Sequence, residues 1–237
     1  MKQYLVHKDM CRPRGFLRRE DGTTMVEFAI CISLFLLILF AILDFARLGY
    51  TWVSAEKAVQ QAARTASLRP AVCDGVPPFH FRSLGTPDQY PAGTLCWDGT
   101  QGVCEVPSPV PQCTLQSALT SGDQVRQDAA QNIWDRMAPL LPDNLSAANV
   151  RITYGHDNRL GFVGGPYVPV ITAELIGVGD NNCNGNPCFT FVTPLSALAA
   201  NAGAADTSGV PAKGGTIPFP GISATVPGED INSGMNG

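Results

Sequence analysis

The run Tyr154, Gly155, His156 and Asp157 has the residue types most capable of chemistry in this chain. A histidine beside a carboxylate can transfer protons or bind a metal ion. A solvent-exposed turn after a strand explains the run at least as well, because glycine and aspartate favour turns. Both interpretations stay open for this position.

Common enzyme motifs are missing from the sequence, which has no G-x-S-x-G nucleophile elbow, no P-loop and no H-E-x-x-H pair. The glycines at 161, 164 and 165 have the wrong spacing for a dinucleotide-binding turn and predict a hairpin loop. Residues 180–186 carry many side-chain oxygens but lack the bidentate glutamate of an EF-hand, so they predict a turn. We expect a protein that is not an enzyme and that needs no cofactor.

Zinc ligands are also poorly spaced. No C-x-x-C pair occurs, and the three histidines, His7, His80 and His156, lie far apart in the sequence. A metal site would therefore need long-range packing to assemble it, and we expect none. The net charge of -4 with 15% charged residues gives no basic field of the kind that binds a phosphate backbone, which argues against nucleic acid as a partner.

Residues 23–43 form an apolar segment whose only charged side chain is Glu27. At about 1.5 Å per residue, a helix over this segment would span the roughly 30 Å hydrocarbon core of a lipid bilayer. The flank before it carries six basic and three acidic residues, which predicts a cytoplasmic N-terminus and a domain on the other side of the membrane. A secretory signal peptide fits poorly, because its apolar core is only about 7 to 15 residues long. An uncleaved signal anchor remains an alternative.

Six of the eight cysteines follow the apolar segment. An even set on the far side of a membrane indicates disulfides formed in an oxidising compartment, and buried free thiols are the alternative. The turn-forming residues between Cys183 and Cys188 favour a local bridge, which leaves four cysteines to pair among themselves. The disulfide candidates are Cys73, Cys96, Cys104, Cys113, Cys183 and Cys188.

Glu27 is unusual because a charge within the hydrocarbon costs about 2.5 to 3.5 kcal/mol on insertion scales. It stands five residues after Gly22. If the chain were cut after Gly22, the new amino group of Thr23 would carry a positive charge. Glu27 of a neighbouring copy could neutralise that charge and turn a burial cost into an attraction.

Residues 18–28 resemble a type IV prepilin leader, since basic residues and Gly22 precede a glutamate and then Phe28. The continuation is similar to the N-terminal block of the TadE-like pseudopilins of tight-adherence (Flp) pilus systems. It carries the Glu27–Phe28 pair, the Asp44–Phe45 ending and an AARTAS run at residues 62–67. The likeness covers about residues 18–69, and its elements are specific in combination rather than singly.

The resemblance implies cleavage after Gly22 by a prepilin peptidase, with Thr23 as the mature N-terminus and Glu27 and Phe28 as recognition and assembly residues. It further implies a minor component that works with the pilus assembly machinery and other pilin-like subunits. The expected location is the inner membrane, with one span, a periplasmic C-terminal domain and association with the pilus after processing. The domain after Pro70 is larger than the family block.

We expect an α+β fold in which a long transmembrane and stalk helix precedes a disulfide-containing domain with a small, mainly antiparallel sheet. The parts are a cytoplasmic leader (1–22), a transmembrane helix (23–43), a stalk helix (44–69), an extracytoplasmic α+β domain (70–198), and a flexible linker with a C-terminal edge strand (199–237).

Periodicity predicts the elements of that outer domain. An apolar stripe from Phe45 to Ala66 packs either on its own domain or on another subunit. A loop region follows from Pro70 to Gln112, and Asp123 caps a second helix. Pro169 makes one strand begin near Val170 or lie at an edge. The helix is expected at residues 121–138, and the strands at 149–154, 167–178, 188–192 and 215–227.

Three functions compete. The leading hypothesis is a minor pseudopilin, processed at Gly22, whose apolar helix moves from the bilayer into a helical bundle at the pilus. The second is an unprocessed, membrane-anchored module whose cysteine-rich domain binds an envelope partner or a surface. The third is an anchored hydrolase or metal enzyme, which rests on His156 and Asp157 alone.

Overall fold

The computed structural model describes residues 21–84, 90–143, 145–177, 190–192, 216–218, 221–229 and 231. The chain divides into two compact units, Met1–Phe45 and Ala46–Gly237. Most of the expected leader and linker, together with Cys183 and Cys188, lies outside the described residues, so the predictions made for them stay predictions.

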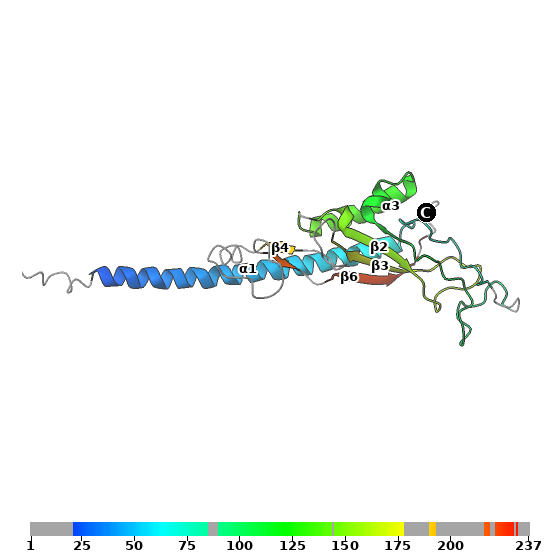
Figure 1. Cartoon of the computed structure of the whole chain (residues 1–237), viewed down its shortest axis with the longest axis horizontal. Coiled ribbons are helices and arrows are strands. Elements are labelled where there is room, and N and C mark those ends of the chain that lie inside the picture. The colour runs from blue at the N-terminus through cyan, green and yellow to red at the C-terminus, as the bar shows by residue number, and fades with distance from the viewer. Residues whose placement is uncertain are drawn as a thin grey trace, which may run out of the picture. The chain divides into compact units, whose positions relative to one another are not determined.

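Helix α1 (Asp21–Ser67) runs for 47 residues through both units (Figure 1). No proline interrupts these residues, and Pro70 follows the last turn because it cannot continue a helix. The predicted stalk helix is confirmed. In the first unit the described residues are this helix alone, and they have no core of their own.

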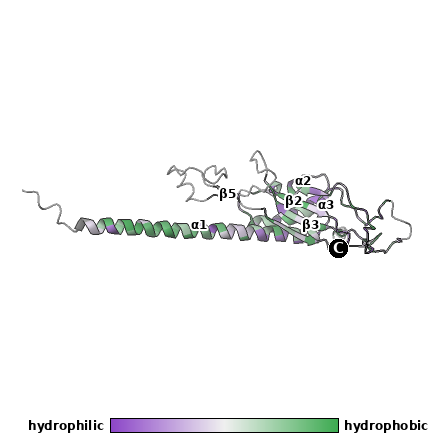
Figure 2. Ribbon diagram, turned by 60° about the horizontal axis from the view of Figure 1, so that its bottom comes forward, coloured by the Kyte–Doolittle hydropathy of each residue, from purple (hydrophilic) through white to green (hydrophobic). Residues whose placement is uncertain are grey.

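The first part of α1 is the one helix among the described residues that is long and apolar enough to cross a membrane. Figure 2 shows that the residues of its N-terminal half are mostly hydrophobic, whereas more hydrophilic residues occur in the later turns. From Met25 to Phe45, every large hydrophobic side chain is at least 38% exposed. An apolar surface of this extent needs lipid or other helices to cover it.

The second unit contains the remaining elements in the following order along the chain. They are β1 (Gln112–Thr114), α2 (Leu115–Leu119), α3 (Gln124–Met137), the 3-10 helices η1 (Ala138–Leu140) and η2 (Ala147–Asn149), β2 (Val150–Gly155), β3 (Val170–Leu175), β4 (Thr190–Val192), β5 (Thr216–Pro218) and β6 (Ser223–Pro227).

A four-stranded antiparallel sheet in the order β1-β2-β3-β6 forms the centre of this unit. Ile152 pairs with Ala173 and Tyr154 pairs with Ile171, so these side chains share one face of the sheet. Arg151 and Glu174 pair on the opposite face, where they form an ion pair. One face is therefore buried and the other is partly exposed to solvent.

Helices α1 and α3 pack with the buried face of the sheet into one hydrophobic core. The face of α1 in this core consists mostly of alanines, and small side chains let a helix lie close to its neighbours. Its six fully buried residues are Ala55, Ala58, Val59, Ala62, Ala63 and Ala66. For these turns the apolar stripe packs on its own domain, which confirms the first of the two alternatives for this part of the helix.

Most of the predicted elements are confirmed, including the α+β class. Asp123 caps α3 by accepting the N–H of Val125 at 3.0 Å. Strand β3 begins at Val170, directly after Pro169, and β6 lies at an edge of the sheet. One prediction needs correction. The segment expected as one strand at residues 215–227 forms two strands, β5 and β6, and β5 pairs with β4 in a separate two-stranded sheet.

Candidate assembly helix and its anchoring domain

The residues predicted for processing and assembly lie in the first two turns of α1. Gly22 is the second residue of the helix, and Thr23, Glu27 and Phe28 follow with exposed side chains. Residues four apart share one face of a helix, so Thr23 and Glu27 lie one turn from each other, separated by a rise of about 6 Å. A positive group on Thr23 and the carboxylate of Glu27 would thus lie on the same side of the helix.

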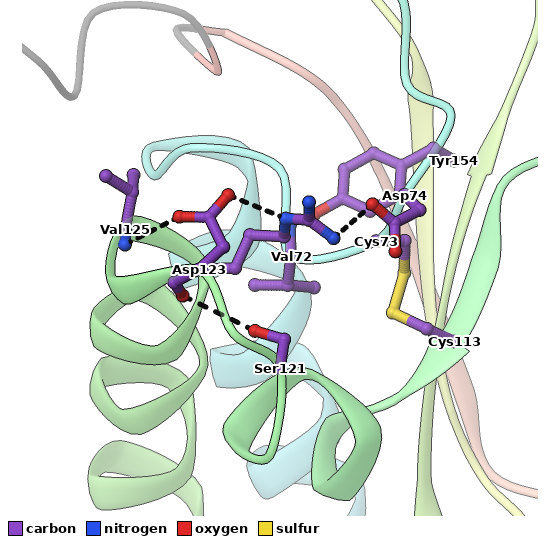
Figure 3. Close-up of polar contacts among 9 residues, drawn as sticks. Val72, Cys73, Asp74, Cys113, Ser121, Asp123, Val125 and Tyr154 are labelled. Atoms are coloured by element: carbon purple, nitrogen blue, oxygen red, sulfur yellow. Dashed lines mark hydrogen bonds and ion pairs between the residues drawn. A yellow bond between two sulfur atoms is a disulfide. The ribbon is translucent and has the colours of Figure 1, made fainter.

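The end of α1 is tied to the sheet by a buried hydrogen bond and a disulfide (Figure 3). The N–H of Val72 donates to the hydroxyl of Tyr154 at 3.0 Å. Burial raises the pKa of Tyr154 to about 12, so the hydroxyl stays protonated. Cys73 forms a disulfide with Cys113, the central residue of β1. These two links fix the position at which the chain leaves the helix.

An ionic contact adds a third link between this turn and α3. Arg126 forms ion pairs with Asp123, at 3.0 Å, and with Asp74. The hydrogen bond from Arg126 holds the pKa of Asp123 below its usual value. Because Asp74 is largely exposed and Asp123 is partly exposed, the contact adds little to stability and serves mainly to orient the turn.

Replacing Tyr154 with phenylalanine should lower the free energy of unfolding by about 1 to 3 kcal/mol, because the buried N–H of Val72 would lose its partner. Tyr167→Phe is the matched control, since its buried hydroxyl has no partner among the described residues. We expect that change to be neutral or stabilising. Denaturant unfolding in detergent would measure both, and equal losses in the two variants would contradict the assignment.

Beyond these links, the described residues 71–84, 90–111 and 156–169 form what we call the loop layer. Isolated bridges join Phe79 to Pro166 and Arg82 to Cys104, and a second disulfide joins Cys96 to Cys104. Both observed disulfides lie within the group of four cysteines that the sequence analysis left to pair among themselves. The loop layer is therefore an ordered part of the domain that has little regular secondary structure.

A groove of about 610 Å³ opens on the loop layer. Phe79 and Phe81 line it beside Pro107 and Val110, and both phenylalanines are about half exposed. Glu105 supplies a carboxylate at the same groove. The lining thus combines exposed aromatic rings with polar groups, and the sequence analysis had singled out neither phenylalanine.

Two of the three histidines come together in the loop layer. The ring centroids of His80 and His156 lie 6.0 Å apart, and each also contacts the ring of Tyr167. His80 is 1% exposed, and the ring nitrogens of His156 are buried without a hydrogen-bond partner. The long-range packing that a histidine cluster needed is thus present.

A metal ion does not fit this cluster well. The atoms of His80, Cys96 and Cys104 approach within 4.8 Å of one another, but the two sulfurs are bonded to each other as a disulfide. The Nε2 atom of His80 accepts the N–H of Val168 at 3.1 Å, so its lone pair is already used. Histidine ligands of metals normally donate from their second nitrogen, whereas Nδ1 of His80 has no acceptor among the described residues.

The run from Tyr154 to Asp157 is split by the fold. Tyr154 faces the core and holds Val72, whereas Asp157 accepts the N–H of Arg159 and closes a turn. His156 contacts His80 and Tyr167 instead of its sequence neighbours. The geometry favours the turn interpretation of this run over an acid–base site.

Comparison with known proteins bears on the helix rather than on the loop layer. The model of the TadE-like protein family matches residues 22–64, which is nearly all of α1. This segment is TadE-like. The match implies a pilin-like protein associated with a tight-adherence pilus. No curated protein and no solved structure matches the chain.

The TadE-like segment begins at Gly22 and contains Thr23, Glu27 and Phe28. It ends at Arg64, so the match extends into the turns of α1 that lie in the core of the second unit. The sheet, the disulfides and the loop layer all lie outside the matched residues. The groove and the histidine cluster are therefore features of the domain that the TadE-like segment carries.

Proposed function

We propose that this protein is a minor pseudopilin that acts in the assembly of a tight-adherence pilus after cleavage of a prepilin-type leader. The observation that carries the proposal is the match of residues 22–64 to the TadE-like family. In the same segment, the apolar surface of α1 is left exposed by the described residues. The peptidase cuts between Gly22 and Thr23 in the inner membrane, and the domain after α1 lies in the periplasm.

The mechanism needs no active site. The bilayer covers the apolar helix in the single subunit, and helices of other pilin-like subunits cover it in the assembly. Cleavage creates a positive amino group on Thr23, which Glu27 of a neighbouring copy neutralises. An unpaired charge is costly in hydrocarbon, so this pairing favours the assembled state.

N-terminal sequencing of the protein from its native host tests the proposal. The wild-type protein should begin at Thr23, and Gly22→Leu should retain the residues before it, because a peptidase that reads a glycine has no room for leucine. Gly15→Leu, in the same flank, is the matched control and should still begin at Thr23. An unprocessed N-terminus in the wild-type protein would contradict the proposal.

The groove favours a second candidate, an unprocessed membrane-anchored module that binds an envelope protein. Its apolar lining by Phe79 and Phe81 suits a partner segment, whereas pseudopilin assembly through α1 does not require it. The same sequencing experiment separates the two candidates, because the module would keep its leader.

A further inference from the structure

The hydrogen bond between His80 and Val168 defines the protonation state of the buried imidazole. Because Nε2 of His80 accepts the N–H of Val168 at 3.1 Å, Nε2 cannot carry a proton in this arrangement. The neutral ring must then carry its proton on Nδ1, which is buried without an acceptor among the described residues. His80 therefore acts as a hydrogen-bond acceptor only while it is uncharged.

The backbone of Gly161 lies directly against the same nitrogen. A Cβ atom on Gly161 would lie 2.1 Å from Nε2 of His80, and the φ angle of Gly161 is +82°. Both observations require a glycine at this position. The imidazole fits against the backbone of the loop so closely that it has no room to turn toward solvent while the loop stays closed.

Among the described residues, no carboxylate contributes to the pKa of His80, so an imidazolium there would have no counter-charge. His156 is a second base, and its positive form would repel a charge on His80. Burial raises the pKa of Tyr167 to about 12, so this neighbour stays neutral. The disulfide of Cys96 and Cys104 does not titrate, and the carboxylate of Asp157 accepts the N–H of Arg159 and does not contribute to the pKa of His80.

Protonation would also set a donor against a donor, because an Nε2–H group would face the N–H of Val168. The strand-like segment around His80 is held to the loop by three further bonds. The N–H of His80 donates to Gly165 at 2.9 Å, the N–H of Gly164 donates to His80 at 2.8 Å, and the N–H of Tyr167 donates to Pro78 at 3.2 Å. A charged ring can reach water only if the loop of residues 161–168 separates from this segment.

We propose that His80 is an acid-sensitive latch, which holds the loop of residues 161–168 closed while it is neutral and releases the loop when it is protonated. Release would reshape the groove, because Phe79 lines it and forms a bridge with Pro166 of the same loop. The latch thus gives the apolar surface of the domain two states that differ with the acidity of its surroundings.

The direction of the pH dependence follows from the pKa of His80. Burial, and then the charge of His156, lower this pKa from its ordinary value of 6.5. The open state binds a proton more readily than the closed state, so closure is fully favoured above pH 6.5 and weakens as the pH falls below it. One proton can raise the open population by up to about tenfold per pH unit in this range.

Amide hydrogen exchange of the full chain in detergent tests the latch between about pH 7.5 and about pH 5. After correction for the intrinsic exchange rates, protection of residues 161–168 should fall by up to about tenfold per unit below pH 6.5, while β2 and β3 keep theirs. Constant protection of the loop in the wild-type protein would overturn the proposal.

Three variants isolate His80 as the cause. His80→Gln supplies an acceptor for Val168 that does not titrate, so the loop should stay closed in acid. His156→Gln leaves the bond of His80 intact and should retain the response over a narrower pH range, because one cause of the lowered pKa of His80 is lost. His7→Gln also removes one imidazole and should retain the full response. An acid response in His80→Gln equal to that of the wild-type protein would overturn the proposal.

If His80→Gln does not fold, a titration of the imidazole signals of the wild-type protein by NMR tests the latch instead. The spectra of the His7→Gln and His156→Gln variants identify the signal of His80. The latch requires a pKa for His80 below 6.5 in the folded protein, whereas a value at or above 6.5 would overturn it.

Discussion

Removing the disulfide between Cys73 and Cys113 by a double alanine substitution should lower the free energy of unfolding by about 4 kcal/mol. The two residues are separated by 40 positions, and the entropy that a disulfide removes from the unfolded chain grows with the length of the closed loop. The bond also lies at the junction between the end of α1 and the sheet, where Cys73 is 5% exposed.

Unfolding by denaturant, followed by tryptophan fluorescence, measures this loss. All three tryptophans follow residue 45, so the signal reports on the second unit rather than on the apolar part of α1. The double alanine variant of Cys96 and Cys104 is the matched control. That bond closes a separation of only 8 positions and should contribute about 2.5 kcal/mol. A smaller loss for the Cys73 and Cys113 pair than for the control would contradict the prediction.

The long helix and the central strands could be predicted because each follows from a local pattern. An unbroken apolar run with no proline defines α1, and alternation of buried and partly buried residues defines β2 and β3. Pro169 also marked the start of β3 correctly, since a proline cannot donate to a central ladder. These are the parts of the fold in which neighbours in sequence determine the structure.

Short elements were missed because their stability comes from tertiary contacts. Strand β1 has three residues and α2 has five, which is too short for a periodic signal. Strand β1 exists because it pairs with β2, and the disulfide from Cys73 holds its central residue. The sequence from Pro70 to Gln112 is rich in proline and glycine, holds four cysteines with Cys113, and shows no sustained periodicity.

The histidine cluster was missed for a related reason. His80 and His156 are 76 positions apart, and no sequence pattern links two loops that meet only after the sheet has formed. The available signals were weak: an apolar phenylalanine on each side of His80, which indicates burial, and the glycines from 161 to 165, which predict a tight loop. Only the structure shows that the loop closes on the imidazole.

The two units of the chain differ in how their apolar residues are covered. In the second unit the alanine face of α1 is covered by the sheet, so this part of the helix is already buried within one molecule. In the first unit the described residues have no such cover. Because only the first unit needs lipid or another helix, effects on assembly should come from substitutions there, and effects on stability from substitutions in the core.

Replacing Glu27 with glutamine should therefore stop assembly while leaving processing intact. The proposed cut lies between Gly22 and Thr23, and glutamine keeps the size and shape of the side chain that the peptidase would meet at position 27, so the variant should still begin at Thr23. The amino group of Thr23 would then lack its partner inside the helical bundle, and an uncompensated buried charge costs about 3 to 5 kcal/mol. Copurification with other pilin-like subunits should fall by well over tenfold, since about 1.4 kcal/mol already corresponds to that factor.

Glu56→Gln is the matched control, because it makes the same chemical change on an exposed position of α1 outside the apolar segment. It should affect neither processing nor copurification. If Glu27→Gln assembles as well as this control, the carboxylate has no partner in the assembly, and charge pairing with Thr23 fails as the mechanism. If processing is lost as well, Glu27 acts first in recognition by the peptidase, and its role in assembly must be tested on a chain that already begins at Thr23.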